Sequence, residues 1–184
     1  RGRRAWLGGL TSMVAIAAIT PWSTVARAAD PIVPGDLVGR FRYVGGAREE
    51  QTLRTAIGVL SDEMNFLIRS YAKRKLEETN QVPRVIGFGL VGPSLQVEIP
   101  GLPTITAPTD GSRVKWKDQF GDDVKLRQRI KGRRLVQQFV GAQGSRDIVY
   151  QLAPDGERLS FAVKISSKHL PWPLRYRLSY RRAG

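Results

Sequence analysis

Residues 123–140 read DVKLRQRIKGRRLVQQFV, and this stretch decides the fold class. In its first half apolar and basic side chains alternate, as in Val124-Lys125-Leu126-Arg127. A period of two places the two kinds of side chain on opposite faces of a β-strand. Lys131-Gly132 then separates the two halves in the manner of a tight turn. The stretch therefore predicts an antiparallel hairpin with one apolar and one charged face.

The same period of two recurs on both sides of this hairpin. Residues 37–44 alternate near the start, and the pattern returns at Arg84 and continues to Arg181. Pairs such as Asp155-Gly156 separate the runs, as tight turns do. Further strands are expected at 84–91, 94–99, 103–107, 113–117, 148–152, 158–165 and 174–181. We therefore predict a mainly β domain, an antiparallel up-and-down barrel of about 8–10 strands that closes or nearly closes on itself.

Residues 47–79 have a different period. Their apolar side chains recur at steps of three and four residues, which is the spacing of one face of a helix. Residues 58–63 contain a glycine and a cap-like Ser-Asp-Glu, which favours two consecutive helices over a single one. We expect a helical lid inserted after the first strand, with Leu60, Met64 and Leu67 on its apolar face.

The first residues have the layout of a signal peptide. Basic residues precede an apolar stretch from Ala5 to Ile19, and Ala26-Arg27-Ala28 matches the small-x-small pattern that signal peptidase requires. The apolar stretch is shorter than the roughly 20 residues of a membrane-spanning helix, and a retained N-terminal anchor is the alternative. Arg3–Leu7 resembles the bacterial twin-arginine export signal. We expect cleavage after Ala28 and a periplasmic or secreted protein.

These features divide the chain into a signal peptide at 1–28, a lead-in at 29–36 and a barrel domain at 37–182. The formal net charge of the chain is +14, and because residues 1–28 hold four arginines and no acid, +10 remains after cleavage. The chain contains no cysteine, so packing rather than disulfides has to stabilise the exported domain. We expect a monomer and, because of export, no nucleic-acid partner.

The basic side chains are concentrated on the polar sides of the expected strands, for example at Lys125, Arg127, Arg175 and Arg177. Two interpretations are open. The charges form either a solvated exterior or a positive wall that docks on an anionic membrane surface or an acidic polymer.

No catalytic or metal-binding constellation stands out. Residues 87–92 read GFGLVG, but Pro93 and an alternating strand follow where a dinucleotide site requires a helix. His169 is the single histidine, and without cysteine it cannot form a zinc site of the usual kind. We therefore expect no catalytic residues, no metal and no cofactor, and predict that the protein is not an enzyme.

The side chains expected inside the barrel are aromatic residues and one amide. They either pack a core or line a pocket that holds an apolar ligand and hydrogen-bonds its polar group, and the sequence favours neither. The candidates are Phe41, Tyr43, Trp116, Gln128, Phe139, Tyr150, Phe161, Tyr176 and Tyr180.

Residues 37–181 resemble the calycins, meaning lipocalins and, more closely, fatty-acid-binding-protein-like barrels. The resemblance rests on Gly39-Arg40-Phe41 in the first strand, the helical segment directly after it, the strand meander and the basic-aromatic strand 175–181. It implies a barrel cavity that holds a lipid beneath a helical lid. Phe41 stands where lipocalins have tryptophan. The last-strand Arg-x-Tyr that clamps a carboxylate in the fatty-acid family is absent, because Arg177 and Tyr180 are three residues apart.

Three functions remain in competition at this stage. The first is an exported binding protein that holds a lipid or another hydrophobic small molecule in the barrel. The second is a cell-envelope interaction module whose basic outer surface binds anionic membrane or polysaccharide. The third, an outer-membrane barrel, requires an uncharged lipid-facing side and would leave the lumen crowded with arginine and lysine.

Overall fold

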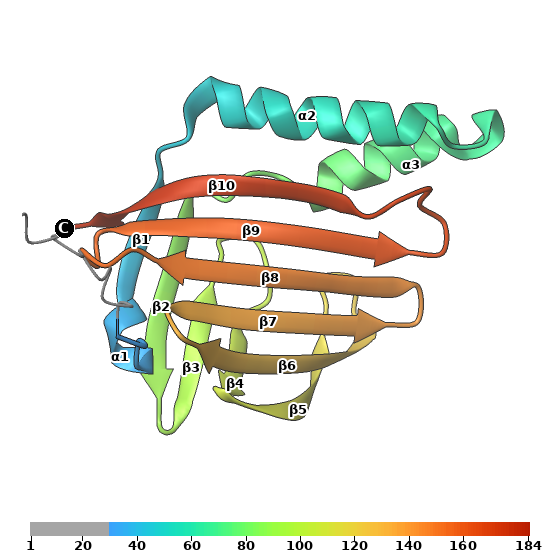
Figure 1. The fold of residues 1–184 in the computed structure, drawn as a ribbon. Coiled ribbons are helices and arrows are strands. Elements are labelled where there is room, and N and C mark those ends of the chain that lie inside the picture. The colour runs from blue at the N-terminus through green and yellow to red at the C-terminus, as the bar shows by residue number, and fades with distance from the viewer. Residues whose placement is uncertain (1–29) are drawn as a thin grey trace, which may run out of the picture.

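The computed structural model describes residues 30–184, so the expected signal peptide at 1–28 lies outside the described residues. Within residues 30–184 the structure has three helices and ten strands (Figure 1). The helices are α1 (Pro34–Leu37), α2 (Gly46–Asp62) and α3 (Phe66–Thr79). The strands are β1 (Gly39–Tyr43), β2 (Val85–Val91), β3 (Ser94–Glu98), β4 (Ile105–Pro108), β5 (Asp110–Lys117), β6 (Asp123–Lys131), β7 (Arg134–Gly141), β8 (Gly144–Leu152), β9 (Arg158–Ser167) and β10 (Leu174–Ala183).

All ten strands form one antiparallel sheet in the order β4-β3-β2-β1-β10-β9-β8-β7-β6-β5. The sheet curls into a barrel because β1 pairs with both β2 and the last strand, β10. Among residues 30–184 no β-ladder joins the edge strands β4 and β5, so the barrel is nearly closed. These observations confirm the predicted class, a mainly β, antiparallel barrel with a helical segment inserted after its first strand.

Helices α2 and α3 form a helical hairpin along the barrel beside β10 (Figure 1). The break between them lies at residues 63–65, at the end of the 58–63 region in which we expected it. Gly58 continues α2, and the chain restarts at Asn65, whose side-chain Oδ1 accepts a hydrogen bond from the backbone N–H of Leu67 at 3.0 Å. A cap of this kind satisfies a free N–H group of the first turn and defines where a helix begins.

The two helices contribute unequally to the apolar packing under the lid. Leu60 of α2 and Met64 of the turn after it are buried with Leu174 of β10. Leu67 is 76% exposed, so the expectation that it faces the barrel with the others is wrong. The reason is that α3 buries none of its residues completely and rests on the barrel mainly through its C-terminal end. No helix within residues 30–184 combines the length and apolar composition needed to cross a bilayer.

A chain of buried polar side chains connects strands on both sides of the gap in the sheet. The Gln128 amide on β6 donates to the carbonyl oxygens of Leu95 on β3 and Ala107 on β4, at 3.0 and 2.8 Å. Its own oxygen accepts from the Gln137 amide at 2.6 Å, and the Gln137 oxygen accepts from the Tyr150 hydroxyl at 3.1 Å. Both glutamines are fully buried. Each member therefore has partners, which is what makes a buried polar chain tolerable.

Replacing Gln128 by leucine should destabilise the protein by about 2–4 kcal/mol, because Gln137 and two carbonyl groups lose a buried partner. Urea unfolding followed by circular dichroism measures this change. Gln138→Leu, on the exposed side of β7, is the matched control and should cost much less. Equal losses in the two variants would show that the chain does not hold the edges of the sheet together.

Candidate functional site

A cavity of about 570 Å³ occupies one end of the barrel. It lies where the β5–β6 and β7–β8 turns and the end of β9 meet the C-terminal end of α3. Its wall is mainly apolar and includes Trp116, Phe139, Ile148, Phe161 and Ile165. Inward-facing positions of β5, β7, β8 and β9 supply these side chains, which is why the period of two in the sequence brings them together.

The indole of Trp116 is held in place on this wall. Its Nε1 donates to the carbonyl of Thr104 at 3.2 Å, and its ring meets that of Phe139 edge to face with centroids 5.4 Å apart. An aromatic wall fixed in this way presents a rigid apolar surface to the cavity.

The rest of the barrel interior is a packed core. Tyr150 is fully buried, with ring centroids 5.3 Å from both Phe88 and Phe161, and Phe161 continues the series to Tyr180 at 6.0 Å. Phe41 closes the other end of this series against Phe88 at 5.7 Å. The inside of the barrel is thus half core and half cavity.

The nine candidate pocket residues divide between these two halves. Trp116, Phe139, Phe161 and Tyr176 line the cavity. The other five candidates do not line the cavity. Four of them are buried in the core, namely Phe41, Tyr150, Tyr180 and Gln128, and Tyr43 is partly buried beside the core.

A positive side chain points into the cavity from β8. Arg146 lies two residues before the inward-facing Ile148, opposite Phe139 of β7 and Ile165 of β9. Its Nη2 donates to the backbone carbonyl of Thr79 at 3.0 Å and to Oδ1 of Asn80 at 2.6 Å. No carboxylate within residues 30–184 pairs with it. The guanidinium therefore has donors to spare on the cavity side.

Asn80 joins this arginine to the lid. It is buried just after α3, and its amide nitrogen donates to the carbonyl of Leu76 within the helix at 2.8 Å. Its oxygen also accepts from the Tyr176 hydroxyl at 3.3 Å. Arg146, Asn80 and Tyr176 thus form one hydrogen-bonded group that ties the end of the lid to the cavity wall.

A cation–π contact joins α3 to the β5–β6 turn beside the cavity. Phe120 lines the cavity and is about half exposed at that turn. The ammonium group of Lys75 on α3 lies 3.6 Å from the centre of its ring. Such a contact is typically worth about 0.5–1 kcal/mol at an exposed site.

The tyrosines at and below the cavity stay protonated at neutral pH. Burial raises the pKa of the Tyr176 hydroxyl, and the charge of Arg146 partly opposes that rise. Burial likewise raises the pKa of Tyr150 and Tyr180 well above the ordinary value. The Tyr176 hydroxyl is therefore available as a neutral hydrogen-bonding group at the cavity.

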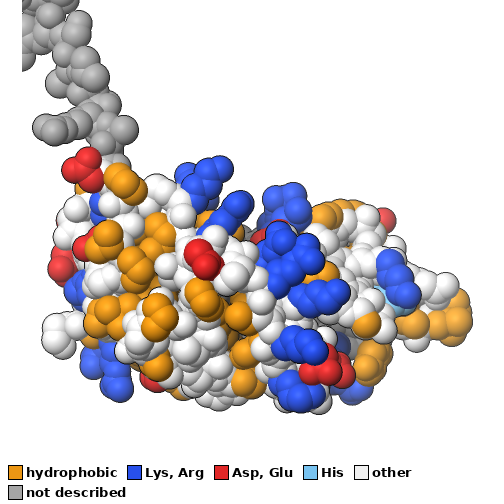
Figure 2. Space-filling view, turned by 90° about the horizontal axis from the view of Figure 1, so that it is seen from below, with side chains coloured by type: hydrophobic (Ala, Val, Ile, Leu, Met, Phe, Trp, Pro, Cys, Tyr) orange, Lys and Arg blue, Asp and Glu red, His pale blue; other side chains and the backbone are white. Residues whose placement is uncertain are grey.

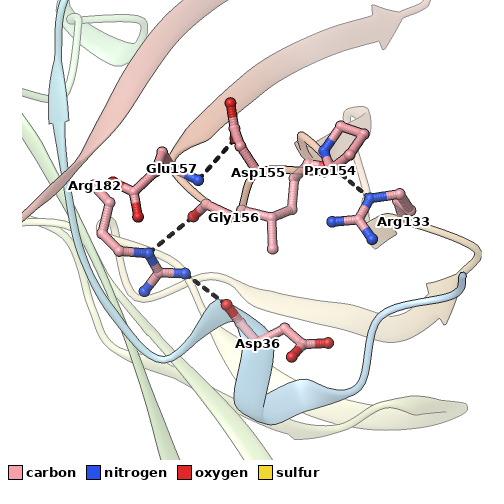
Figure 3. Close-up of a pocket in the computed structure, with 8 residues that line it drawn as sticks. Asp36, Arg133, Pro154, Asp155, Gly156, Glu157 and Arg182 are labelled. Carbon is pink, nitrogen blue, oxygen red and sulfur yellow. Dashed lines mark hydrogen bonds between the residues drawn. The ribbon is translucent and has the colours of Figure 1, made fainter. Parts of the chain in front are cut away.

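A second hollow, of about 350 Å³, lies among α1, the β8–β9 turn and the end of β10 (Figure 3). The Arg182 guanidinium donates to the carbonyl oxygens of Asp36, Val38 and Gly156 at 2.6–2.9 Å. Arg133 likewise donates to the carbonyls of Asp30, Leu152 and Ala153. These hydrogen bonds hold the lead-in against this end of the barrel, so the two arginines that line the hollow have a structural role.

The other motifs considered in the sequence, residues 87–92 and His169, do not line the cavity. Residues 87–92 form part of β2 and the turn after it, which confirms the interpretation of GFGLVG as a strand. His169 is exposed in the connection between β9 and β10, with Nε2 3.3 Å from the Gln143 side chain. Within residues 30–184 no three His, Cys, Asp or Glu side chains are grouped so as to hold a metal ion.

Sequence reasoning missed Arg146, Asn80 and Gln137. The signal for Arg146 was present, because extending the alternation of Ile148, Tyr150 and Leu152 back by one step reaches it. Asn80 follows the helical pattern directly and reads as a chain-ending residue. Its role depends on a contact with a residue 66 positions away in sequence, which no local pattern reveals.

The raised tyrosine pKa values predict a loss of stability in alkali. Unfolded tyrosine ionises near pH 10, whereas the buried hydroxyl of Tyr180 does not, so above that pH the unfolded state binds fewer protons. The free energy of unfolding should then fall by up to about 1.4 kcal/mol per pH unit for each such tyrosine. Urea unfolding between pH 8 and 11 measures the slope.

The comparison variants are Tyr180→Phe and Tyr71→Phe, the latter on the exposed part of α3. Tyr180→Phe should flatten the alkaline slope, and Tyr71→Phe should leave it unchanged. The same slope in all three proteins would contradict the assignment.

Solved structures share this fold at low sequence identity. A fatty-acid-binding protein of Schistosoma mansoni in complex with arachidonic acid has a TM-score of 0.52 and 15% identity, covering 81% of this chain and 97% of that one. Lipid-binding protein 8 of Caenorhabditis elegans has a TM-score of 0.53 and 11% identity, covering 83% and 99%. A secretory abundant heat-soluble protein of Ramazzottius varieornatus has a TM-score of 0.51 and 9% identity, covering 80% and 96%.

Neither protein-family models nor curated protein sequences gave a match to the chain. On the evidence of the solved structures, the chain has the fold of the fatty-acid-binding, calycin-like barrels.

Proposed function

We propose that this protein is an exported carrier that binds a lipid or another hydrophobic small molecule with an anionic head group. The ligand lies in the cavity of about 570 Å³, with its apolar part against the aromatic wall and its head group at Arg146. The observation that carries the proposal is this cavity, whose lining is mainly apolar and includes one basic side chain, Arg146, which has no carboxylate partner among residues 30–184. The acidic residues of the lining, Asp118, Asp122 and Asp123, belong to the β5–β6 turn and the residue after it.

The dimensions and chemistry of the cavity support a small ligand. Ligand sites are typically clefts of roughly 300–1,000 Å³, mostly apolar, with a few polar groups that fix orientation. Trp116, Phe139 and Phe161 supply the apolar surface, and Tyr176 adds a neutral hydroxyl near the arginine. The packed core below limits the depth of the site, which favours a compact or bent ligand.

The unpaired arginine supports an anionic head group. A buried or half-buried charge is costly unless a partner compensates it, and carboxylate or phosphate groups accept hydrogen bonds from guanidinium in a matching planar geometry. Arg146 uses Nη2 for the lid and has further N–H groups for such a ligand. Arg146 lies on β8, not on the last strand, where the fatty-acid family places its carboxylate clamp. Arg177 of the last strand, β10, is exposed on the outer wall.

The structural neighbours agree with this proposal in general terms. The Schistosoma mansoni protein was solved with arachidonic acid, and another neighbour, with a TM-score of 0.50 and 14% identity, is described as a fatty acid transporter. At such identities the likeness is one of fold, so the choice of ligand rests on the cavity of this chain itself.

Export is the second part of the proposal. Its support is the sequence of residues 1–28, with a basic start, a short apolar stretch and Ala26-Arg27-Ala28 before the barrel domain. The absence of cysteine from the chain is compatible with an oxidising compartment, because no thiol is present to form unwanted disulfides.

Binding of matched amphiphiles tests the proposal. Dodecanoate and dodecanol differ in the head group alone, and displacement of a dansyl-labelled undecanoate probe measures the affinity of each. We expect the delipidated protein to prefer dodecanoate. Arg146→Gln should weaken dodecanoate binding by about tenfold or more while changing dodecanol binding little, because hydrogen bonds to a charged partner are worth about 1.5–3 kcal/mol.

Arg177→Gln removes the same charge from the exposed outer side of β10 and is the control, for which no change is expected. Failure of both amphiphiles to bind the wild-type protein would refute the carrier function. Equal weakening of both ligands in Arg146→Gln would refute the head-group assignment.

A further inference from the structure

The outer wall of the barrel carries a basic strip on the hairpin β5–β6. We define it by five exposed side chains that face away from the cavity, namely Arg113, Lys115, Lys125, Arg127 and Arg129. Figure 2 looks at the underside of the barrel, where Figure 1 places β4, β5 and β6, and shows Lys and Arg side chains gathered on this face.

Like charges in this strip face one another directly. In the antiparallel register Arg113 is the partner of Arg127, and Lys115 is the partner of Lys125. Cross-strand neighbours of the same sign destabilise a sheet. The protein therefore carries an electrostatic cost at this position that an anionic partner would remove.

One acidic residue, Asp110, is the register partner of Arg129, but the two form no ion pair, and the other four residues of the strip have no acidic partner in the β5–β6 register. The ion pair on this hairpin, Lys117 with Asp123 at 3.0 Å, lies at its turn end and leaves the five residues of the strip out. Among residues 30–184 none of the five pairs with a carboxylate. Their charge is free for a partner outside the chain.

The shape and composition of the strip indicate the partner. It is two side chains wide, because the β7 residues opposite Lys125, Arg127 and Arg129 are the uncharged Val140, Gln138 and Val136. The remaining outward residue of β7, Arg134, is opposite Lys131 and lies beyond the end of the strip. Along each strand successive outward side chains lie about 6.6 Å apart. Such a narrow, linear row of positive charge matches a linear polyanion better than a broad planar surface.

Aromatic side chains are absent from the outward positions of β5, β6 and β7 in the described chain. Proteins that bind single-stranded nucleic acid stack bases on aromatic rings, and proteins that lie in a membrane interface insert aromatic or large apolar anchors. We propose that the basic strip binds a linear acidic polysaccharide through charge alone. This proposal does not depend on the cavity, since Trp116 and Leu126 between the basic residues face the other side of the sheet.

The test compares two variants that each remove two exposed positive charges from the wall. Lys115→Gln/Lys125→Gln alters the strip, and Arg175→Gln/Arg177→Gln alters the outer face of β10. Isothermal titration with heparin and with polygalacturonate measures binding at several salt concentrations. We expect the strip variant to lose about tenfold or more in affinity and the control variant much less, with wild-type affinity falling steeply as salt screens the charges.

Three outcomes would overturn the proposal. One is an equal loss in both variants, which would indicate attraction to net charge without a defined site. Another is tighter binding to duplex DNA, or to phosphatidylcholine vesicles containing phosphatidylserine, than to either polysaccharide. The third is polysaccharide affinity that does not respond to salt. The thermal midpoint of the strip variant should not fall, because the substitution relieves like-charge repulsion, and probe binding in the cavity should be unchanged.

Discussion

The hydrogen-bonded chain from Tyr150 through Gln137 and Gln128 to the carbonyls of Leu95 and Ala107 is the constraint on which the rest of the structure depends. It connects β6, β7 and β8 to β3 and β4 across the gap in the sheet, where no ladder provides that connection among residues 30–184. Because all its members are buried and paired, breaking it costs more than an ordinary hydrogen bond. Gln128, Gln137 and Tyr150 are all fully buried and none of them lines the cavity, so the chain belongs to the packed part of the barrel.

The division of the barrel interior into core and cavity determines what the cavity can do. In the core, aromatic rings pack one against the next from Phe41 to Tyr180, and Phe161 of this series reaches the cavity wall. At the cavity, Arg146 connects the wall to the end of α3 through Asn80. In the proposed function, the head group binds next to the contact between Arg146 and the residues at the end of α3.

The fold was predictable because a period of two continues through most of the chain, and a change of period marks the helices. The contents of the barrel were not, because Phe41 and Phe139 have the same inward pattern although one lies in the core and the other on the cavity wall. Which end of a barrel is hollow depends on packing between strands far apart in sequence. Leu67 was misplaced for a related reason, since an apolar helical face does not show whether a partner surface covers it.

Nuclear magnetic resonance of the ¹⁵N-labelled protein titrated with dodecanoate tests the central claim most directly. We expect the Arg146 side-chain Nε–H signal and the backbone signals of Asn80, Phe139 and Ile165 to shift with a single dissociation constant. Signals near Gln128 and Phe41 should stay in place, because that half of the barrel is packed. Shifts confined to the outer wall, or spread evenly through the core, would contradict the account.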